Sequence, residues 1–340
     1  MDEEVEERGS LVKFNIKDVA QKAGVSISTV SRVINSSKPV KQKTKDKVLD
    51  AIEELGYRPN AIARSLKVKH TKSIGIMTPD IANQFYPEVV RGIEDVANMY
   101  EYSIFLCNTD LNEEKELQYF AELEEKQIDG LIFLGNHVSK ELRNEMESAD
   151  IPVVLIGGKA TGIPSVTINN EKAAKDAVDF LLNRNHRRIG IITGKMKDPM
   201  MGQARLKGYQ KALEEKGIEV KEELVIEGGY RYKSGYDGAK RLMALKVPPT
   251  AIFVCSDEMA IGACRAILED GHEIPKDVAI VGFDNVDISG KVYPSLSTIG
   301  QPMYEMGAIA MRLLTKILHN ESIGASDIVL DYEVIEREST

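Results

Sequence analysis

The stretch NIKDVAQKAGVSISTVSRVIN, residues 15–35, decides how the first part of this 340-residue chain folds. Its first half carries apolar residues at helical spacing, with Asn15 placed to cap the start of a helix and Gly24 placed just past its end. Its second half predicts another short helix, which Ser26 caps and whose inward face carries Val30, Val33 and Ile34. A third amphipathic stretch follows, and we expect it to bury Val48, Leu49, Ile52 and Leu55. Two short helices joined by a tight turn, followed by a packing helix, form a helix-turn-helix arrangement.

The outer face of the second helix is thin and polar. Ile27, Ser28, Ser31 and Arg32 lie on the side opposite to the apolar residues. Hydroxyl groups reach bases or phosphates without bulk, and one arginine can give two hydrogen bonds to a guanine in the major groove. The pattern therefore predicts a DNA-reading helix, with a small three-helix protein-interaction domain as the alternative.

The charge of the chain is divided unevenly. Residues 13–70 carry 13 Lys and Arg against 5 Asp and Glu, a net charge of +8, whereas residues 1–12 carry 1 Arg against 5 acids, a net charge of −4. Since the whole chain has a net charge of −9, residues 71–340 must carry −13 (−9 − 8 + 4). A basic segment on an acidic body indicates that the basic segment alone binds a polyanion. The acidic residues 1–12 would repel DNA, and we expect them to be disordered.

A second motif follows the basic helices. Together, IKDVAQKAGVSISTVSRVIN and LGYRPNAIARSL resemble the LacI/GalR family of bacterial transcription regulators almost position by position. The resemblance implies that residues 58–70 form a hinge helix and linker, and that the hinge is ordered only on operator DNA, where Leu66 wedges into the minor groove beside Asn60 and Ala63. The DNA-binding residues that we expect are Lys17, Ser26, Ile27, Ser28, Thr29, Ser31, Arg32, Asn35, Asn60, Ala63 and Leu66.

From Ser73 onward, short apolar runs alternate with amphipathic stretches. The runs have the length and composition of buried strands: SIGIM, SIFLC, GLIFLG and VVLIG, then RIGIIT, AIFVCSD and VAIVGFD. Repeated strand–helix units predict an α/β fold with two lobes, each a parallel sheet covered by helices on both faces. The resemblance implies a two-lobed core like that of periplasmic binding proteins, with crossings between lobes near Asn170, Gln301 and Gly324. The expected parts are a tail (1–12), a head (13–57), a hinge and linker (58–70), an N-terminal lobe (71–170 and 301–324) and a C-terminal lobe (171–300 and 325–340).

The sequence offers no sign of an enzyme, a metal site or a cofactor. It contains no phosphate-binding loop, dinucleotide fingerprint, zinc-protease motif or nucleophile elbow. The three cysteines, Cys107, Cys255 and Cys264, lie far apart in apolar runs, which predicts buried free thiols in a cytoplasmic protein. No apolar run reaches 18 residues, so we expect no membrane span.

Binding groups follow several of the predicted strands, where open α/β sheets bind their ligands. We expect an effector, a sugar or phosphosugar, between the lobes at Asp80, Phe85, Arg205, Asp257 and Asp284, with Asn83 and Tyr86 nearby. The resemblance implies that Arg205 meets an effector hydroxyl or phosphate. For Asp257, a structural role as a helix cap is an equal alternative. Asn169 stands where the family commonly has an acid, which puts the strength or charge of effector binding in doubt.

Two further stretches, FYPEVVRGIEDVANMYEY and QPMYEMGAIAMRLLTK, are similar to the branch of the family that controls carbon catabolism. That branch takes as corepressor the phosphocarrier protein HPr, phosphorylated on its regulatory serine. Arg312 and Lys316 are four residues apart, so they share a helix face and could hold one phosphoserine. The matching positions are Glu88, Asp95, Met99, Tyr100, Tyr304, Glu305, Arg312 and Lys316, of which Glu305 replaces the usual aspartate.

We therefore expect a homodimeric, DNA-binding regulator of carbon catabolism, mostly a repressor, whose affinity for palindromic operators is raised by serine-phosphorylated HPr and by phosphosugars. A repressor released directly by a sugar between the lobes is the alternative. A sugar-binding protein or enzyme with a helical appendage is a more remote one.

Overall fold

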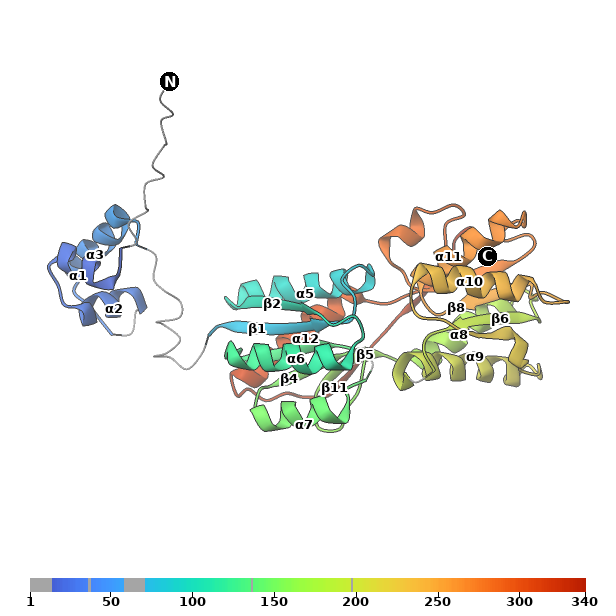
Figure 1. The fold of residues 1–340 in the computed structure, drawn as a ribbon, viewed down its shortest axis with the longest axis horizontal. Helices are drawn as coiled ribbons and strands as arrows, with labels where there is room; N and C mark the ends of the chain where they lie inside the picture. The colour runs from blue at the N-terminus through green and yellow to red at the C-terminus, as the bar shows by residue number, and fades with distance from the viewer. Residues whose placement is uncertain (1–13, 36–37, 58–70, 136, 197) are drawn as a thin grey trace, which may run out of the picture. The chain divides into compact units, whose positions relative to one another are not determined.

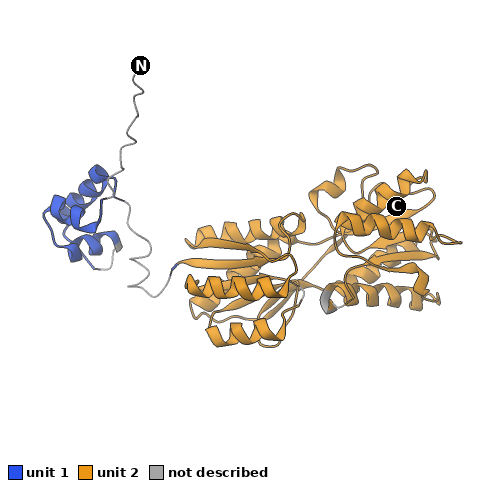
Figure 2. Ribbon diagram, viewed as in Figure 1, with its two compact units in different colours: residues 1–71 blue, residues 72–340 orange. Residues whose placement is uncertain are grey.

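The structure, a computed structural model, describes residues 14–35, 38–57, 71–135, 137–196 and 198–340. The chain divides into two compact units, residues 1–71 and residues 72–340 (Figure 2). The expected acidic tail and the expected hinge helix lie outside the described residues, as do Asn60, Ala63 and Leu66.

The first unit contains three helices, α1 (Ile16–Ala23), α2 (Ile27–Asn35) and α3 (Gln42–Leu55). The Asn15 side chain accepts a hydrogen bond from the Lys17 amide, and the Asp18 carboxylate accepts one from the Asn15 amide, so both ends of a capping box are present. Gly24 ends α1 with a φ of 66°, a left-handed conformation that favours glycine. Ser26 Oγ accepts a hydrogen bond from the Thr29 amide at 3.2 Å, which confirms the predicted cap of α2.

The core of this unit differs from the prediction at one residue. The buried residues are Val19, Ala20, Ala23, Val30, Val33, Val48 and Ala51. Leu49, which we expected to be buried, is 46% exposed. Successive residues of a helix point about 100° apart, so Leu49 is turned away from the face that carries Val48, Ala51, Ile52 and Leu55.

The second unit contains two six-stranded sheets (Figure 1). The strand order of the first sheet is β11-β5-β4-β3-β1-β2, with β1 (Ser73–Thr78), β2 (Ser103–Asn108), β3 (Gly130–Leu134), β4 (Val153–Ile156), β5 (Ser165–Ile168) and β11 (Asp327–Leu330). The order of the second sheet is β12-β10-β9-β8-β6-β7, with β6 (Ile189–Thr193), β7 (Val225–Glu227), β8 (Ala251–Val254), β9 (Ala279–Asp284), β10 (Ser297–Gly300) and β12 (Glu333–Ile335).

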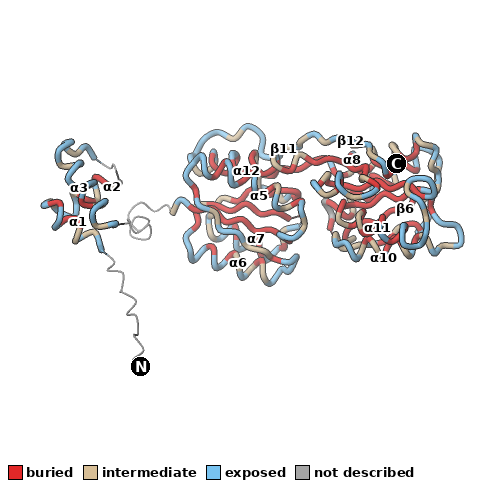
Figure 3. Tube along the Cα trace, turned by 90° about the horizontal axis from the view of Figure 1, so that it is seen from above, coloured by how far each residue is buried: buried red, intermediate tan, exposed pale blue. Residues whose placement is uncertain are grey.

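Helices cover both faces of each sheet (Figures 1 and 3). In the first lobe, α5 (Phe85–Met99) and α12 (Met303–Leu318) lie on one face, and α6 (Glu113–Glu125) and α7 (Lys140–Ala149) lie on the other. In the second lobe, α8 (Asn170–Leu182) and α9 (Ala204–Glu215) lie opposite α10 (Tyr232–Met243) and α11 (Asp257–Glu269). Short helices span Pro199–Gln203, Glu222–Leu224 and Asp287–Gly290. The two-lobed α/β fold with parallel sheets is confirmed, and no described helix is long and apolar enough to cross a membrane.

Three details of the predicted lobes are wrong. Strand β12 pairs antiparallel with β10, so the second sheet is not wholly parallel. Strand β2 is an edge strand with Phe105 and Leu106 exposed, so it is not buried. All three cysteines are free as predicted, and Cys255 and Cys264 are buried, but Cys107 on this strand is only half-buried. Strand β11 pairs with β5 in the first sheet, so the third crossing lies after Leu330 and not near Gly324.

Helices α5 and α12 approach each other closely because each has a glycine at their contact. A Cβ atom at Gly92 would lie 2.0 Å from the carbonyl oxygen of Tyr304, and a Cβ atom at Gly307 would lie 2.0 Å from the carbonyl oxygen of Val89. Both obstacles are backbone atoms, which cannot move aside as a flexible side chain can. The two glycines therefore fix the distance between the helices on the outer face of the first lobe.

We expect Gly92→Ala to lower the melting temperature, because the added methyl group must push two packed helices apart. Overpacking of this kind costs about 1–3 kcal/mol or more. Gly324→Ala is the matched control, since a Cβ atom there meets no atom within 4 Å. Thermal unfolding followed by circular dichroism measures both variants, and equal melting temperatures would contradict the close contact.

Candidate functional site

The exposed face of α2 carries the side chains that were predicted to read DNA. Ile27, Ser28 and Arg32 are exposed, and Lys17 is exposed on the neighbouring helix α1. Ser26 Oγ lies 2.9 Å from both Ser28 Oγ and Thr29 Oγ1, so these hydroxyl groups form a short hydrogen-bonded chain at the start of the helix. Thr29 and Ser31 are half-buried, and the side chain of Asn35 lies outside the described atoms.

Arg205 is a charged residue of the second unit that is almost wholly buried, with only 1% of it exposed. Its Nε donates a hydrogen bond to Asn170 Oδ1 at 3.0 Å, and Nη1 donates one to the carbonyl oxygen of Cys255 at 2.6 Å. The guanidinium carbon lies 3.5 Å from the centre of the Phe283 ring. Its third nitrogen, Nη2, is buried and has no partner in the described structure. A buried donor without a partner is costly, so this nitrogen is suited to an incoming acceptor.

Arg205 borders a small cavity of about 20 Å³ between the carboxyl ends of the strands of the two lobes. Residues of both lobes line it: Asn83, Phe85, Tyr86, Met201, Arg205, Tyr230, Ser256 and Asp284. Three of the five predicted effector residues, Phe85, Arg205 and Asp284, therefore lie together. This structure has room there for about one water molecule.

Asp284 is the carboxylate of this cavity. Its Oδ1 accepts a hydrogen bond of 2.7 Å from Gln301 Nε2, where the chain returns to the first lobe. Burial raises the pKa of Asp284 above its usual value, and the positive charge of Arg205 opposes that rise. The site thus pairs a hydrogen-bonded carboxyl group with a guanidinium that has a free donor.

Asp257 is not at the cavity. Its carboxylate is fully buried and accepts hydrogen bonds from Thr298 Oγ1 at 2.6 Å and from the Val286 amide at 3.0 Å. Nor is it the cap of α11, because Ser256 precedes the helix and accepts a hydrogen bond from the Met259 amide. The side chain of Asp257 instead joins α11 to β10 and to the loop after β9.

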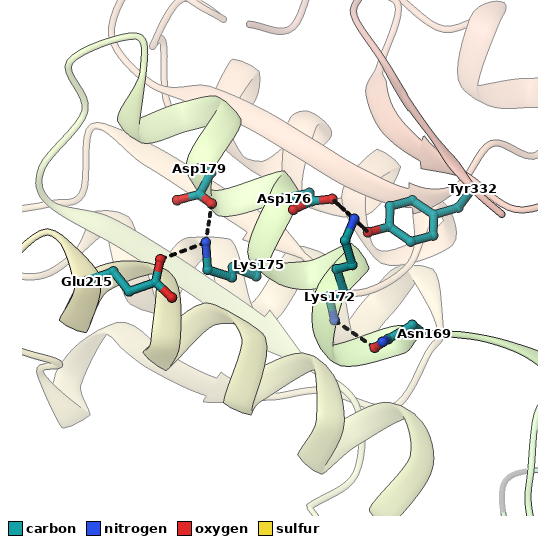
Figure 4. A network of polar contacts seen from close by, with 7 residues as sticks. All are labelled: Asn169, Lys172, Lys175, Asp176, Asp179, Glu215 and Tyr332. Carbon is teal, nitrogen blue, oxygen red and sulfur yellow. Dashed lines mark hydrogen bonds and ion pairs between the residues drawn. The ribbon is translucent and has the colours of Figure 1, made fainter. Parts of the chain in front are cut away.

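Asp80 and Asn169 also have partners within the protein. Asp80 Oδ2 lies 2.9 Å from Arg231 Nη1, an ion pair that joins the two lobes. Asn169 caps α8 by accepting a hydrogen bond from the Lys172 amide (Figure 4). In the same network, Tyr332 Oη, in the third crossing, bonds to Lys172 and to Asp176, so the crossing is tied to α8. Asn169, which stands where the family commonly has an acid, therefore acts as the N-cap of α8.

Three residues that line the cavity, Met201, Tyr230 and Ser256, were not predicted from the sequence. Tyr230 follows β7, and Ser256 follows β8, so both occupy the strand-end position that guided the other predictions. Tyr230 donates a hydrogen bond of 3.3 Å to Asp198 Oδ2. The three-residue strand β7 was too short to be expected, and with it the aromatic residue that follows was overlooked.

The predicted corepressor residues lie on α5, on Tyr100 just after it, and on α12. Tyr304 Oη donates a hydrogen bond of 2.9 Å to Asp95 Oδ2 and thereby joins the exposed edges of the two helices. Met99, Tyr100, Glu305, Arg312 and Lys316 are exposed, and Glu88 is half-buried. Among the described residues, no carboxylate lies within ion-pair distance of Arg312 or Lys316. The two cations are available to an external anion.

The described residues were also considered as metal ligands. Across the described parts of the chain, no three His, Cys, Asp or Glu side chains gather as metal ligands would.

Comparison with known proteins gives the family. Residues 15–60 match the lacI family of bacterial regulatory proteins, and residues 178–340 match the periplasmic binding protein-like domain. The chain is 44% identical to Catabolite control protein A of Priestia megaterium, over 97% of this chain and all of that protein.

Solved structures agree with this relationship. The transcription regulator CcpA of Lactococcus lactis is similar with a TM-score of 0.75 and 35% identity, over 79% of this chain and 98% of that one. The lac repressor dimer bound to operator and the anti-inducer ONPF is similar with a TM-score of 0.87 and 27% identity, over 96% of this chain and 99% of that one. The chain therefore belongs to the LacI family of bacterial regulatory proteins, and it is a DNA-binding transcription regulator of carbon catabolism rather than an enzyme.

Proposed function

We propose that this regulator binds palindromic operators as a homodimer, mostly as a repressor, and that HPr phosphorylated on serine raises its affinity for DNA. The DNA-binding part of the proposal is supported by the exposed face of α2, which presents hydroxyl groups and Arg32. The exposed Lys17 of α1 lies on the neighbouring helix. The lac repressor, similar over 96% of this chain, has been captured as a dimer on its operator.

The corepressor part is supported by the surface that α5 and α12 share. Arg312 can grip a phosphate with two hydrogen bonds from its planar guanidinium, and Lys316 adds a mobile charge one helical turn away. A phosphoserine carries a charge of about −1.5 to −2 at neutral pH, so two unpaired cations suit it. Met99 and Tyr100 offer exposed apolar area beside them, which would pack against the partner protein.

A small effector, a sugar or phosphosugar, would bind between the lobes at Phe85, Arg205 and Asp284. The unpartnered Nη2 of Arg205 favours this site, because an effector oxygen would satisfy the buried donor. The same observation supports the alternative of a repressor that a sugar releases directly from DNA. The two cases differ in whether the effector raises or lowers the affinity for the operator.

We expect Arg32→Ala to weaken binding to the cognate operator by roughly 1–3 kcal/mol and to relax discrimination at one base pair of each half-site. Lys43→Ala, on α3, removes the same charge and is the matched control. It should lower affinity for operator and random DNA alike, through phosphate contacts only. Fluorescence anisotropy with operator, base-substituted operator and random duplexes measures both variants. An equal loss for Arg32→Ala on operator and random DNA would show that Arg32 touches phosphate alone.

We expect Arg312→Ala to abolish the stimulation of operator binding by phosphorylated HPr, and Arg312→Lys to restore it only in part, since lysine lacks the planar fork. DNA binding without HPr should be unchanged in both variants. Arg241→Ala, an exposed arginine on α10 of the second lobe, is the control. Calorimetric titration with phosphorylated and unphosphorylated HPr measures the interaction directly. Equal binding of both forms would contradict the phosphoserine site and favour the sugar-released repressor.

A further inference from the structure

A third basic side chain lies beside the two cations of α12. His319 is the residue that caps the end of this helix, and its side chain is 41% exposed. It follows Lys316 by three residues and Arg312 by seven, so the three side chains lie along one face of the helix, about one turn apart. Unlike the other two, His319 was not predicted from the sequence to bind a ligand.

The ring of His319 packs against the residue that follows α5. Its centre lies 6.3 Å from the centre of the Tyr100 ring, with the two ring planes inclined by 61°. The carbonyl oxygen of Tyr100 accepts a hydrogen bond of 3.3 Å from Lys72 Nζ, just before β1. An edge-to-face contact of this kind restricts the orientation of the imidazole. His319 is therefore part of the surface that α5 and α12 share.

His319 has one carboxylate partner among the described residues, Glu321. The Oε1 atom of Glu321 lies 3.9 Å from His319 Nδ1, and the Glu321 side chain is 58% exposed. The other charged groups near the imidazole are cations: Lys316 and Arg312 on the same helix, and Lys72 beyond Tyr100. An exposed ion pair at this distance is weak. The imidazole can therefore exchange Glu321 for an anion with more charge.

A phosphate that binds near this end of α12 needs strong positive charge. The last carbonyl groups of a helix carry a partial negative charge, which attracts a protonated imidazole and repels a phosphate. A phosphoserine has three acceptor oxygens and a charge of about −1.5 to −2 at neutral pH. A third cation beside Arg312 and Lys316 offsets the repulsion and gives one more donor to the phosphate oxygens.

We propose that protonated His319 binds the phosphoserine of the corepressor together with Arg312 and Lys316. Its contribution to the affinity then grows as the pH falls from 8 to 6, because histidine ordinarily gains its charge in this range. The inference rests on the proposed binding of serine-phosphorylated HPr, and it adds a binding residue and a pH dependence to that site.

The titration of the phosphate must be separated from that of the histidine. The second proton of a phosphoserine leaves near pH 6, at about pKa 6, so the ligand carries more negative charge at pH 8 than at pH 6. This change acts alike on the wild type and on every variant of the regulator. The contribution of His319 is therefore the ratio of the wild-type affinity to the affinity of His319→Asn at the same pH.

The test is calorimetric titration of the full chain with serine-phosphorylated HPr at pH 6 and pH 8. We expect the wild type to bind about three- to tenfold more tightly than His319→Asn at pH 6, and equally tightly at pH 8. His319→Lys keeps its charge and should bind more tightly than the wild type at pH 8. His272→Asn is the matched control and should behave as the wild type, because His272 of the second lobe is 40% exposed and lies 4.0 Å from Asp277.

Proton NMR of the imidazole groups gives a second readout. The His319 resonance should titrate at a higher pH when phosphorylated HPr is bound, because a bound phosphate favours the protonated ring. The His272 resonance should titrate at the same pH with and without HPr.

The outcomes separate this inference from the proposed function. If phosphorylated HPr binds the wild type but not Arg312→Ala, and His319→Asn binds as tightly as the wild type at pH 6, the phosphoserine site stands and the role of His319 is overturned. An equal loss in His319→Asn at both pH values would also overturn it, because a ring that only packs against Tyr100 contributes the same at each pH. If phosphorylated HPr does not bind the wild type at either pH, the proposed corepressor site falls and this inference falls with it.

Discussion

The second unit is organised around one buried charge. A guanidinium group removed from water is strongly destabilising unless hydrogen bonds and a polarisable surface replace its hydration. Asn170 at the start of α8, the carbonyl group of Cys255 after β8 and the ring of Phe283 on β9 together provide that environment for Arg205. These partners come from three elements, so their relative positions are constrained by a single side chain. In this arrangement Arg205 Nη2 has no hydrogen-bond partner among the described residues. The nitrogen lies at the carboxyl ends of the strands, beside the small cavity.

The same cavity is connected to the outer face of the first lobe through the backbone. Gln301 bonds to Asp284 at the cavity, and two residues later α12 begins and runs to Arg312 and Lys316. Polar contacts between the lobes that the structure describes include the ion pair of Asp80 with Arg231 and the hydrogen bond from the Ile288 amide to Gln84 Oε1. A ligand that alters the distance between the lobes would therefore shift the position of the N-terminal end of α12. Such a path is a physical basis for coupling between effector and corepressor, and its strength is the quantity that binding experiments determine.

Features set by neighbouring residues could be predicted from the sequence, whereas features set by distant residues could not. The helix caps at Asn15, Gly24 and Ser26 depend only on local backbone chemistry. A long apolar run such as that of β9 indicates a buried strand. The short strands β5, β10 and β11 carry serine, threonine or aspartate, and only their partners make them strands. For Asp257, the sequence alone could not separate a cap from a ligand. The hydrogen bond from Thr298, 41 residues away, decides that it is neither.

Glu116 shows that a departure from a local rule can itself be informative. On α6 the buried residues are Glu116, Phe120 and Leu123, the spacing of one apolar face. A glutamate on that face conflicts with the apolar pattern, because its burial costs free energy that valine or leucine would not cost. The sequence EEKELQYFAELEE hides the conflict because it contains six glutamates, and all of them except Glu116 are exposed. A glutamate in register with a buried helix face is therefore a feature that the apolar pattern of a sequence does not predict.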